Sequence, residues 1–237
     1  IDPLWSQQAY LKASNTDNFD SFGSWVAISG DTVVVGARDE DSCSTGVGGA
    51  ASDNACTGAG AVYVFRRTGS LWVQEAYLKA GNTDAGDGFG ATVSISGDTI
   101  VVGAYGEGSC AIGVNGNASN NGCPLAGAAY VFTRSGATWS QQAYLKASDP
   151  DAGDLFMIVA ISGDSIVVGA AGEDSCSTGV NGDATDDGCS DTGAAYVFTR
   201  SGSTWSQQAY LKAGNAGAAD FFGMVAIDGD SVVVGAN

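Results

Sequence analysis

One phrase recurs four times along the chain. Four tryptophans, each opening a segment of the form W-x-Q-x-A-Y-L-K-A, stand at Trp5, Trp72, Trp139 and Trp205, 66 or 67 residues apart. A second phrase, of the form V-x-I-x-G-D-x-x-V-V-G-A, recurs between them at the same spacing. The period is longer than that of the helical solenoid repeats. A chain built this way is constrained to fold as a row of similar units.

Each unit is expected to hold four short antiparallel strands. The V-x-I-x and V-V-G-A segments are rich in β-branched residues and are joined by Gly-Asp, which predicts a hairpin. The segments around Y-V-F and W-x-Q-x-A-Y-L-K form a second such pair, and no segment shows the apolar period of a helix. The sequence therefore predicts an all-β fold, a β-propeller with one four-stranded antiparallel blade per repeat. Within a single repeat domain 1–237, the expected units are an outer strand 4–13, blades 22–80, 89–147 and 156–213, and a first hairpin 222–237.

These segments resemble the FG-GAP repeat, the blade repeat of the integrin α-subunit head and of many secreted bacterial proteins. A Phe-Gly pair followed by Val-Gly-Ala occurs as Phe22-Gly23 with Val35-Gly36-Ala37, Phe89-Gly90 with Val102-Gly103-Ala104, and Phe222-Gly223 with Val234-Gly235-Ala236. The resemblance covers essentially the whole chain and implies a propeller of seven blades.

The chain departs from this family pattern in two places. Met157 follows Phe156 where the pattern has Gly, and the third and fourth repeats are one residue shorter before the Gly-Asp turn. Either the hairpin shifts there or the sequence contains an error. The resemblance also implies a calcium loop before the V-G-A strand, but that position holds only a short Ser-Gly-Asp or Asp-Gly-Asp turn, too short to wrap a cation. The usual calcium site of the family is therefore not expected here.

The expected strands make three and a half blades, which cannot close a seven-bladed ring alone. Three explanations remain open: a fragment of a longer parent chain, a protomer completed by another copy in a ring or fibre, and a compact four-bladed ring lacking one strand. The N-terminal segment would supply the last strand of a blade and the C-terminal segment its first hairpin, so head-to-tail self-association would cover both. The predicted assembly residues are Trp5, Tyr10, Leu11, Val232, Val233 and Val234.

The six cysteines form three pairs with one spacing. Cys43 and Cys56, Cys110 and Cys123, and Cys176 and Cys189 are each 13 residues apart, in the long connection between the second and third strands. Zinc sites usually combine four ligands, and each loop offers only two cysteines. We therefore expect one disulfide within each loop, which indicates an oxidising, extracellular compartment.

Two sets of polar residues are candidates for binding Ca²⁺. Hard cations favour carboxylate and carbonyl oxygens on a flexible backbone, but Asn, Asp and Gly also form turns without any ion. The third loop carries Asn181, Asp183, Asp186 and Asp187; the segments that enter the second and third blades carry Asp84, Asp87, Asp151 and Asp154. For both sets, turn formation is the interpretation that we favour over calcium binding. Asn117 lies in a glycosylation sequon.

Composition excludes several function classes. The formal charge of −17, from 26 acidic and 9 basic residues, opposes binding to nucleic acid or to anionic membranes. No apolar run is long enough to insert into a bilayer. The absence of His removes the commonest general base, and near-identical repeats offer no single differentiated catalytic centre. We expect a non-catalytic extracellular structural or adhesion protein; the alternative is a propeller that binds a glycan or protein through its loops, with or without calcium.

Overall fold

The structure, a computed structural model, describes residues 6–236 and contains strands but no helix within them. The predicted all-β fold is confirmed. In the described part of the chain, no helix has the length and apolar character needed to cross a membrane. The strands are β1 (Phe22–Ser29), β2 (Thr32–Ala37), β3 (Ala61–Thr68), β4 (Leu71–Leu78), β5 (Phe89–Ser96), β6 (Thr99–Ala104), β7 (Ala128–Ser135), β8 (Thr138–Leu145), β9 (Phe156–Ser162), β10 (Ser165–Ala170), β11 (Ala194–Ser201), β12 (Thr204–Leu211), β13 (Met224–Asp228) and β14 (Ser231–Gly235).

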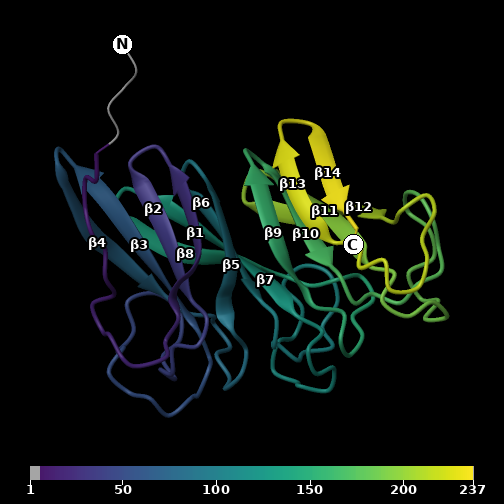
Figure 1. The fold of residues 1–237 in the computed structure, drawn as a ribbon, viewed down its shortest axis with the longest axis horizontal. Coiled ribbons are helices and arrows are strands. Elements are labelled where there is room, and N and C mark those ends of the chain that lie inside the picture. Colours follow the sequence, from purple (N-terminus) through teal and green to yellow (C-terminus); the bar gives the residue numbers. More distant parts are fainter. Residues whose placement is uncertain (1–5, 237) are drawn as a thin grey trace.

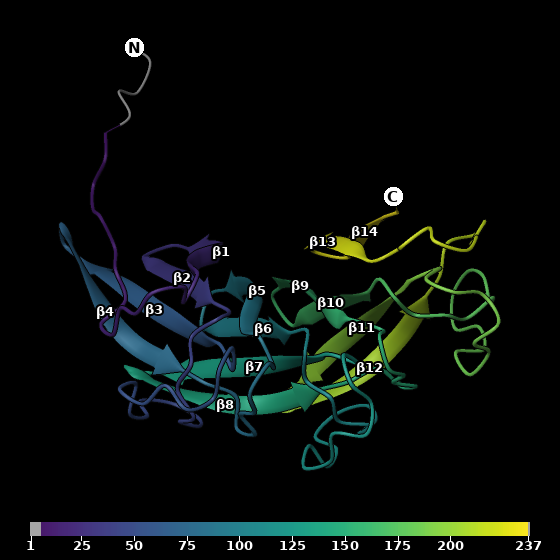
Figure 2. The same cartoon turned by 60° about the horizontal axis from the view of Figure 1, so that its bottom comes forward.

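The strands form successive antiparallel sheets. Three sheets have four strands each, in the orders β1-β2-β3-β4, β5-β6-β7-β8 and β9-β10-β11-β12, and β13-β14 forms a two-stranded sheet. The sheets lie side by side in an open arc (Figure 1). In Figure 2 the first hairpins lie along the inner side of this arc, and β4, β8 and β12 lie along its outer side. This is the arrangement of propeller blades around an axis.

The first hairpin of each blade turns at the recurrent Gly-Asp. In the first blade Ser29 pairs with Thr32, so Gly30 and Asp31 form a two-residue turn. Gly30 has a φ of 56°, a conformation that glycine adopts without a steric penalty. The Asp side chain is used as well, because Asp31, Asp98 and Asp164 accept hydrogen bonds from Arg67, Arg134 and Arg200 of the third strand. The recurrent turn therefore fixes both the hairpin and its connection to the neighbouring strand.

The missing residue of the third repeat is absorbed in a β-bulge. In the first blade Phe22 pairs with Ala37 and Trp25 with Gly36, which leaves two residues in the bulge. In the third, Phe156 pairs with Ala170 and Ile158 with Gly169, which leaves only Met157. The hairpin beyond the bulge keeps the same register. The hairpin therefore does not shift, and no sequence error is needed to explain the shorter repeat.

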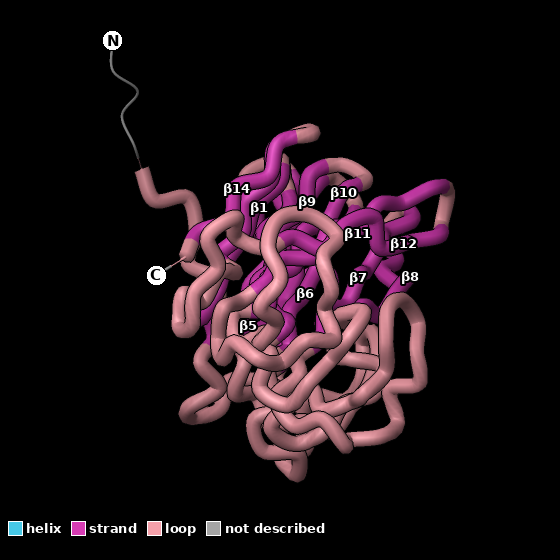
Figure 3. Tube along the Cα trace, turned by 90° about the vertical axis from the view of Figure 1, so that its right-hand side faces the viewer, coloured by secondary structure: helices cyan, strands magenta, loops and turns pink. Residues whose placement is uncertain are grey.

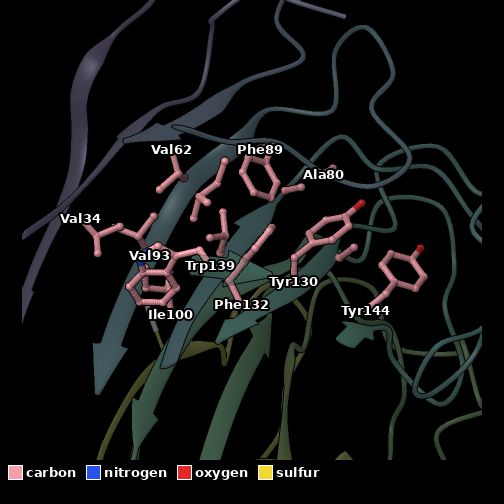
Figure 4. Packing of buried hydrophobic residues seen from close by; sticks show 14 of the residues in the cluster. Val34, Val62, Ala80, Phe89, Val93, Ile100, Tyr130, Phe132, Trp139 and Tyr144 are labelled. Carbon is pink, nitrogen blue, oxygen red and sulfur yellow. The ribbon is translucent and has the colours of Figure 1, made fainter. Parts of the chain in front are cut away.

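Aromatic side chains build an equivalent core in each blade. In the second blade Phe89, Tyr130 and Tyr144 form a buried series, with ring centroids 5.4 Å and 5.2 Å apart (Figure 4). Val34 and Val62 of the first blade belong to the same apolar cluster. Two of the three apolar clusters span neighbouring blades, and burial of this surface joins the three complete blades into one body.

The expected outer strand at 4–13 does not form in this chain. Residues 6–13 have no strand structure, and residues 4 and 5 lie outside the described residues. In the complete blades the last strand pairs with a third strand, as β4 does with β3. The N-terminal segment has no such strand to pair with in the described residues. It runs beside the first sheet instead, where the Ser14 N–H donates to Gln74 Oε1 at 3.1 Å.

Candidate functional site

The long loops of the three complete blades gather at one end of the molecule (Figure 3). Each contains the predicted disulfide: Cys43–Cys56, Cys110–Cys123 and Cys176–Cys189, with Cα–Cα distances of 5.0, 5.2 and 5.0 Å. Each loop also returns to the last strand of its own blade through a single bridge, such as Val114 with Leu145. The loops therefore present a surface fixed by covalent and backbone contacts.

A buried ion pair lies beneath each of these loops. Lys79 Nζ donates to Glu40 at 2.9 Å, Lys146 Nζ donates to Glu107 at 3.0 Å, and Lys212 pairs with Glu173. The side chains of all three lysines are inaccessible to solvent. Burial lowers the pKa of Lys79 and Lys146, and their Glu partners oppose that shift.

These ion pairs decide between two interpretations of the recurrent A-Y-L-K phrase, and for Lys79, Lys146 and Lys212 they support pairing with a loop residue. From sequence, Lys12, Lys79, Lys146 and Lys212 are expected as solvated or loop-pairing charges. Only Lys12 is exposed, because no described blade supplies it with a Glu partner. The sequence does contain a signal for the pairing: three of the four Glu residues stand three positions before the first Cys of a loop.

An Asn joins the first two ion pairs to the turn that enters the blade. Asn82 Nδ2 donates to Glu107 at 3.2 Å, and Asn82 Oδ1 accepts from the Tyr130 hydroxyl at 2.8 Å. Asn15, Glu40 and Tyr63 repeat this arrangement in the first blade. The buried charges therefore sit in networks in which most donors have acceptors.

The acidic residues before each Phe-Gly have the turn role. Asp87 Oδ2 accepts the Asp84 N–H at 2.9 Å, and Asp20, Asp154 and Asp220 accept equivalent hydrogen bonds. Asp84 itself accepts from Asn121 at 3.1 Å. No group of three acidic side chains around Asp84 and Asp87 is close enough to share a cation among the described residues. Asp87 therefore acts as a turn cap, and the Asp84 carboxylate connects the turn to the loop of the same blade.

Asp87 should make stability depend on pH. Burial raises its pKa to about 7, and the nearby Glu107 and Asp84 charges add to this effect. Its unfolded pKa is about 3.9. Between about pH 4 and pH 7 the folded state then binds more protons, so stability falls as pH rises.

Asp87→Asn keeps an acceptor for the Asp84 N–H and removes the charge. We expect the variant to melt a few degrees above the wild type at pH 8, and to lose less stability between pH 5 and pH 8, measured by differential scanning calorimetry. The chain has no His that would titrate in this window. An unchanged pH slope would contradict the assignment.

The four candidates in the third loop do not form one ligand set. Asn181 Oδ1 accepts the Tyr210 N–H at 3.0 Å, and Asp183 accepts both the N–H and the hydroxyl of Thr185. Asp186 Oδ1 accepts the Gly188 N–H at 3.1 Å. Asp183 and Asp186 therefore form local turns, and Asn181 connects the loop to β12. Only Asp187 has a different neighbourhood.

Asp187 lies beside two acidic residues of the turn that enters the third blade. One carboxylate oxygen each of Asp149, Asp151 and Asp187 lies within 4.8 Å of the others. Burial raises the pKa of Asp149, as do the charges of Asp151 and Asp187. Sequence analysis proposed Asp151 and Asp187 in separate sets and missed Asp149. Alignment of the repeats could have found it, because Asn15 and Asn82 occupy its position in the first two repeats.

Contacts between blades depend on one bulged residue in each last strand. Glu75 is bulged between Gln74 and Ala76, and it accepts from Trp139 Nε1 at 3.0 Å and from Arg134 at 3.1 Å in the next blade. Gln142 Oε1 likewise accepts hydrogen bonds from Trp205 Nε1 and Arg200 of the third blade. Bulges redirect side chains, and here they direct one polar group per blade at its neighbour.

The two end blades expose apolar residues that are buried elsewhere. Val26 and Ile28 of β1 are 62% and 65% exposed, whereas the equivalent Val93 and Ile95 of β5 are 2% and 8% exposed. Val233 of β14, a predicted assembly residue, is 68% exposed, and its equivalent Val101 is fully buried. We call Val26 and Ile28 the first-blade flank.

The other predicted positions are mostly accessible. Tyr10 is exposed, Leu11 packs partly against the first-blade core, and Val232 and Val234 are half-buried; Trp5 lies outside the described residues. Asn117 is exposed, and its side-chain oxygen accepts from Ser119 of the same sequon.

Comparison with known proteins identifies the repeat. A family model described as FG-GAP repeat matches residues 5–65, 72–132, 139–198 and 205–237. No curated protein matches the chain.

Proposed function

Because the chain belongs to the FG-GAP repeat family, we propose that it is a non-catalytic extracellular structural or adhesion protein whose blades associate beyond its own two ends. The observation that carries this proposal is the exposure of the first-blade flank and of Val233, at positions that neighbouring blades bury elsewhere in the array. Exposed strands of this apolar type associate with further strands unless they are covered.

The N-terminal segment supports the same proposal. Gln8 occupies the repeat position of Glu75 and Gln142, the residues that contact Arg and Trp of the next blade. Gln8 lines one small pocket together with Arg67 of the first blade. This neighbourhood supports the proposal that the segment supplies the last strand of a preceding blade. The β13–β14 hairpin of a second copy fits the first-blade flank best. In a longer parent chain, the first hairpin of a preceding blade would occupy the same place.

The extracellular location is supported by the three disulfides, which persist in oxidising compartments. The non-catalytic role is supported by the repetition itself. The buried Lys–Glu pairs, the Arg–Asp pairs and the turn-capping aspartates occur equivalently from blade to blade, as structural contacts do.

The test of association is a charge placed on the exposed flank. Val26→Asp with Ile28→Asp should leave the isolated chain folded, because both side chains are already accessible. We expect the wild type to form concentration-dependent oligomers or fibres by light scattering and electron microscopy, and the variant to remain monomeric. Ile112→Asp, an equally exposed position on the second loop, is the matched control and should assemble normally.

Deletion of residues 1–13 should also weaken assembly, because it removes the segment that would supply the last strand of the shared blade. A wild type that stays monomeric at every concentration, or a flank variant that assembles like the wild type, would contradict self-association.

A second candidate function is recognition of a glycan or protein by the loop end. The specific observation is that the stapled loops expose apolar side chains, Ile112 and Val180, on a covalently fixed surface. Fixed exposed loops are common binding surfaces. Binding that is lost in Ile112→Asp and kept in the flank variant would favour this candidate.

A further inference from the structure

The third blade differs from the first two at two facing positions. Asn82 and Asn121 flank Asp84 in the second blade, and Asn15 and Asn54 flank Asp17 in the first. In both, the Asn of the loop donates to the central carboxylate at 3.1 Å. The third blade has Asp149 and Asp187 in place of the two amides, around Asp151. Two neutral donors have therefore become two carboxylates in one place.

These changes leave the three carboxylates without their former partners. In the second blade Asn121 supplies a hydrogen to Asp84, whereas Asp187 has none to give to Asp151 when ionised. The three carboxylate oxygens lie within 4.8 Å of one another, although like charges at this separation repel. In the other blades the same space holds a single carboxylate, which accepts a hydrogen bond from one loop amide, Asn54 or Asn121.

A buried hydroxyl at the same point also lacks a partner. Tyr63 and Tyr130 donate to Asn15 and Asn82 at 2.7 and 2.8 Å. Tyr196 occupies the equivalent repeat position, and Asp149 occupies that of Asn15 and Asn82. The Asp149 charge is among those that raise the pKa of Tyr196, after burial and the Glu173 charge. Tyr196 is fully buried, and its hydroxyl has no hydrogen-bond partner in the described residues. Buried polar groups without partners are rare, and binding of an ion or water is one of the explanations for them.

We propose that Asp149, Asp151 and Asp187 bind Ca²⁺, with the buried Tyr196 hydroxyl beside Asp149 completing the polar wall of the site. An all-oxygen set of carboxylates on flexible turns suits a hard cation and offers none of the nitrogen or sulfur ligands that zinc favours. Calcium tolerates irregular geometry and takes water molecules as further ligands, whereas Mg²⁺ demands near-ideal octahedral geometry. The ion would connect the turn entering the third blade with the stapled loop 176–189.

This inference is independent of how the blades associate. It also differs in place from the Gly-Asp turn before the V-G-A strand, where the family resemblance implies a calcium loop. The repeated chain provides its own reference state, because the first two blades fold with amides at the same positions.

The decisive experiment restores those amides. Full-length protein freed of metal with EDTA is titrated with CaCl₂ by isothermal titration calorimetry, and its Tm is measured with and without millimolar calcium. We expect one calcium per chain and a rise in Tm. Asp149→Asn with Asp187→Asn should weaken binding at least tenfold, remove the calcium-dependent rise, and raise the Tm of the metal-free protein because the repulsion is relieved.

The reverse exchange tests sufficiency. Asn82→Asp with Asn121→Asp places the same three carboxylates in the second blade, and the resulting protein should bind two calcium ions. MgCl₂ in place of CaCl₂ should give the weaker binding. Absence of calcium binding by the wild type, unchanged binding by the amide variant, or tighter binding of Mg²⁺ would overturn the proposal. Light scattering of the same samples keeps this outcome separate from that of the association test.

Discussion

Replacing Lys146 with Met should lower the free energy of unfolding by about 3–5 kcal/mol. The Lys146 ammonium donates to Glu107 at 3.0 Å and to the Gly127 carbonyl oxygen at 2.6 Å, in surroundings without solvent. Its removal leaves the Glu107 carboxylate buried without a counter-ion. An uncompensated buried charge is far more costly than the loss of an exposed pair.

A second substitution separates the missing charge from the missing packing. In Lys146→Met with Glu107→Gln, no buried charge remains, and most of the lost stability should return. Arg38→Gln, which breaks an exposed pair with Asp39, serves as a control and should cost less than about 1 kcal/mol. Chemical denaturation of the three variants provides the measurement. A Lys146→Met protein as stable as the wild type would show that the pair is not buried as described.

Gly103→Ala should destabilise the protein nearly as much as Lys146→Met, although it adds only one methyl group. A Cβ at Gly103 would overlap the main-chain carbonyl oxygen of Met157 in the neighbouring blade and the Thr92 hydroxyl. Main-chain atoms cannot rotate away, so β6 and β9 must separate. We expect a loss of about 3 kcal/mol, at the upper end of overpacking effects, and a Tm lower by roughly 6–12 °C.

The matched control for this prediction is Gly214→Ala. No atom lies within 4 Å of a Cβ built at Gly214, and its φ is not in the left-handed region. Its Tm should stay close to that of the wild type, by the same calorimetric measurement. If Gly103→Ala also melts like the wild type, the close approach of the inner strands is wrong.

The sequence was sufficient for the features that depend on local pattern. Gly-Asp between β-branched segments predicts the β1–β2 hairpin because the turn needs a positive φ at Gly30. The spacing of 13 residues that recurs in all three loops predicts the Cys110–Cys123 bond, because it favours one local connectivity. Gly103, the glycine of V-G-A in the second repeat, lies at a close backbone approach, which a glycine inside a strand pattern can mark. Each of these depends on residues near one another in the chain or on the backbone alone.

Features that depend on a neighbouring element were harder to predict. Lys146 looks like a surface residue in its own strand, and only the folded loop brings Glu107 to it. Residues 6–13 have the composition of a strand, but strand formation needs a partner, and no described strand offers one. Asp149 looked like an ordinary turn residue because its significance depends on Asp187, which is distant in sequence.

The bulge after the recurrent Phe of the three complete blades has a consequence for how such a chain can change in length over time. Phe22 with two bulged residues and Phe156 with one lead into hairpins of identical register. Recombination between copies of the gene segment that joins at this point need not be accurate to the codon, because the protein absorbs the discrepancy before the inner strand begins. Repeats that differ by one residue at this point can then follow one another while each inner hairpin keeps its register. Blade number in this lineage is therefore open to selection without a prior redesign of the junction.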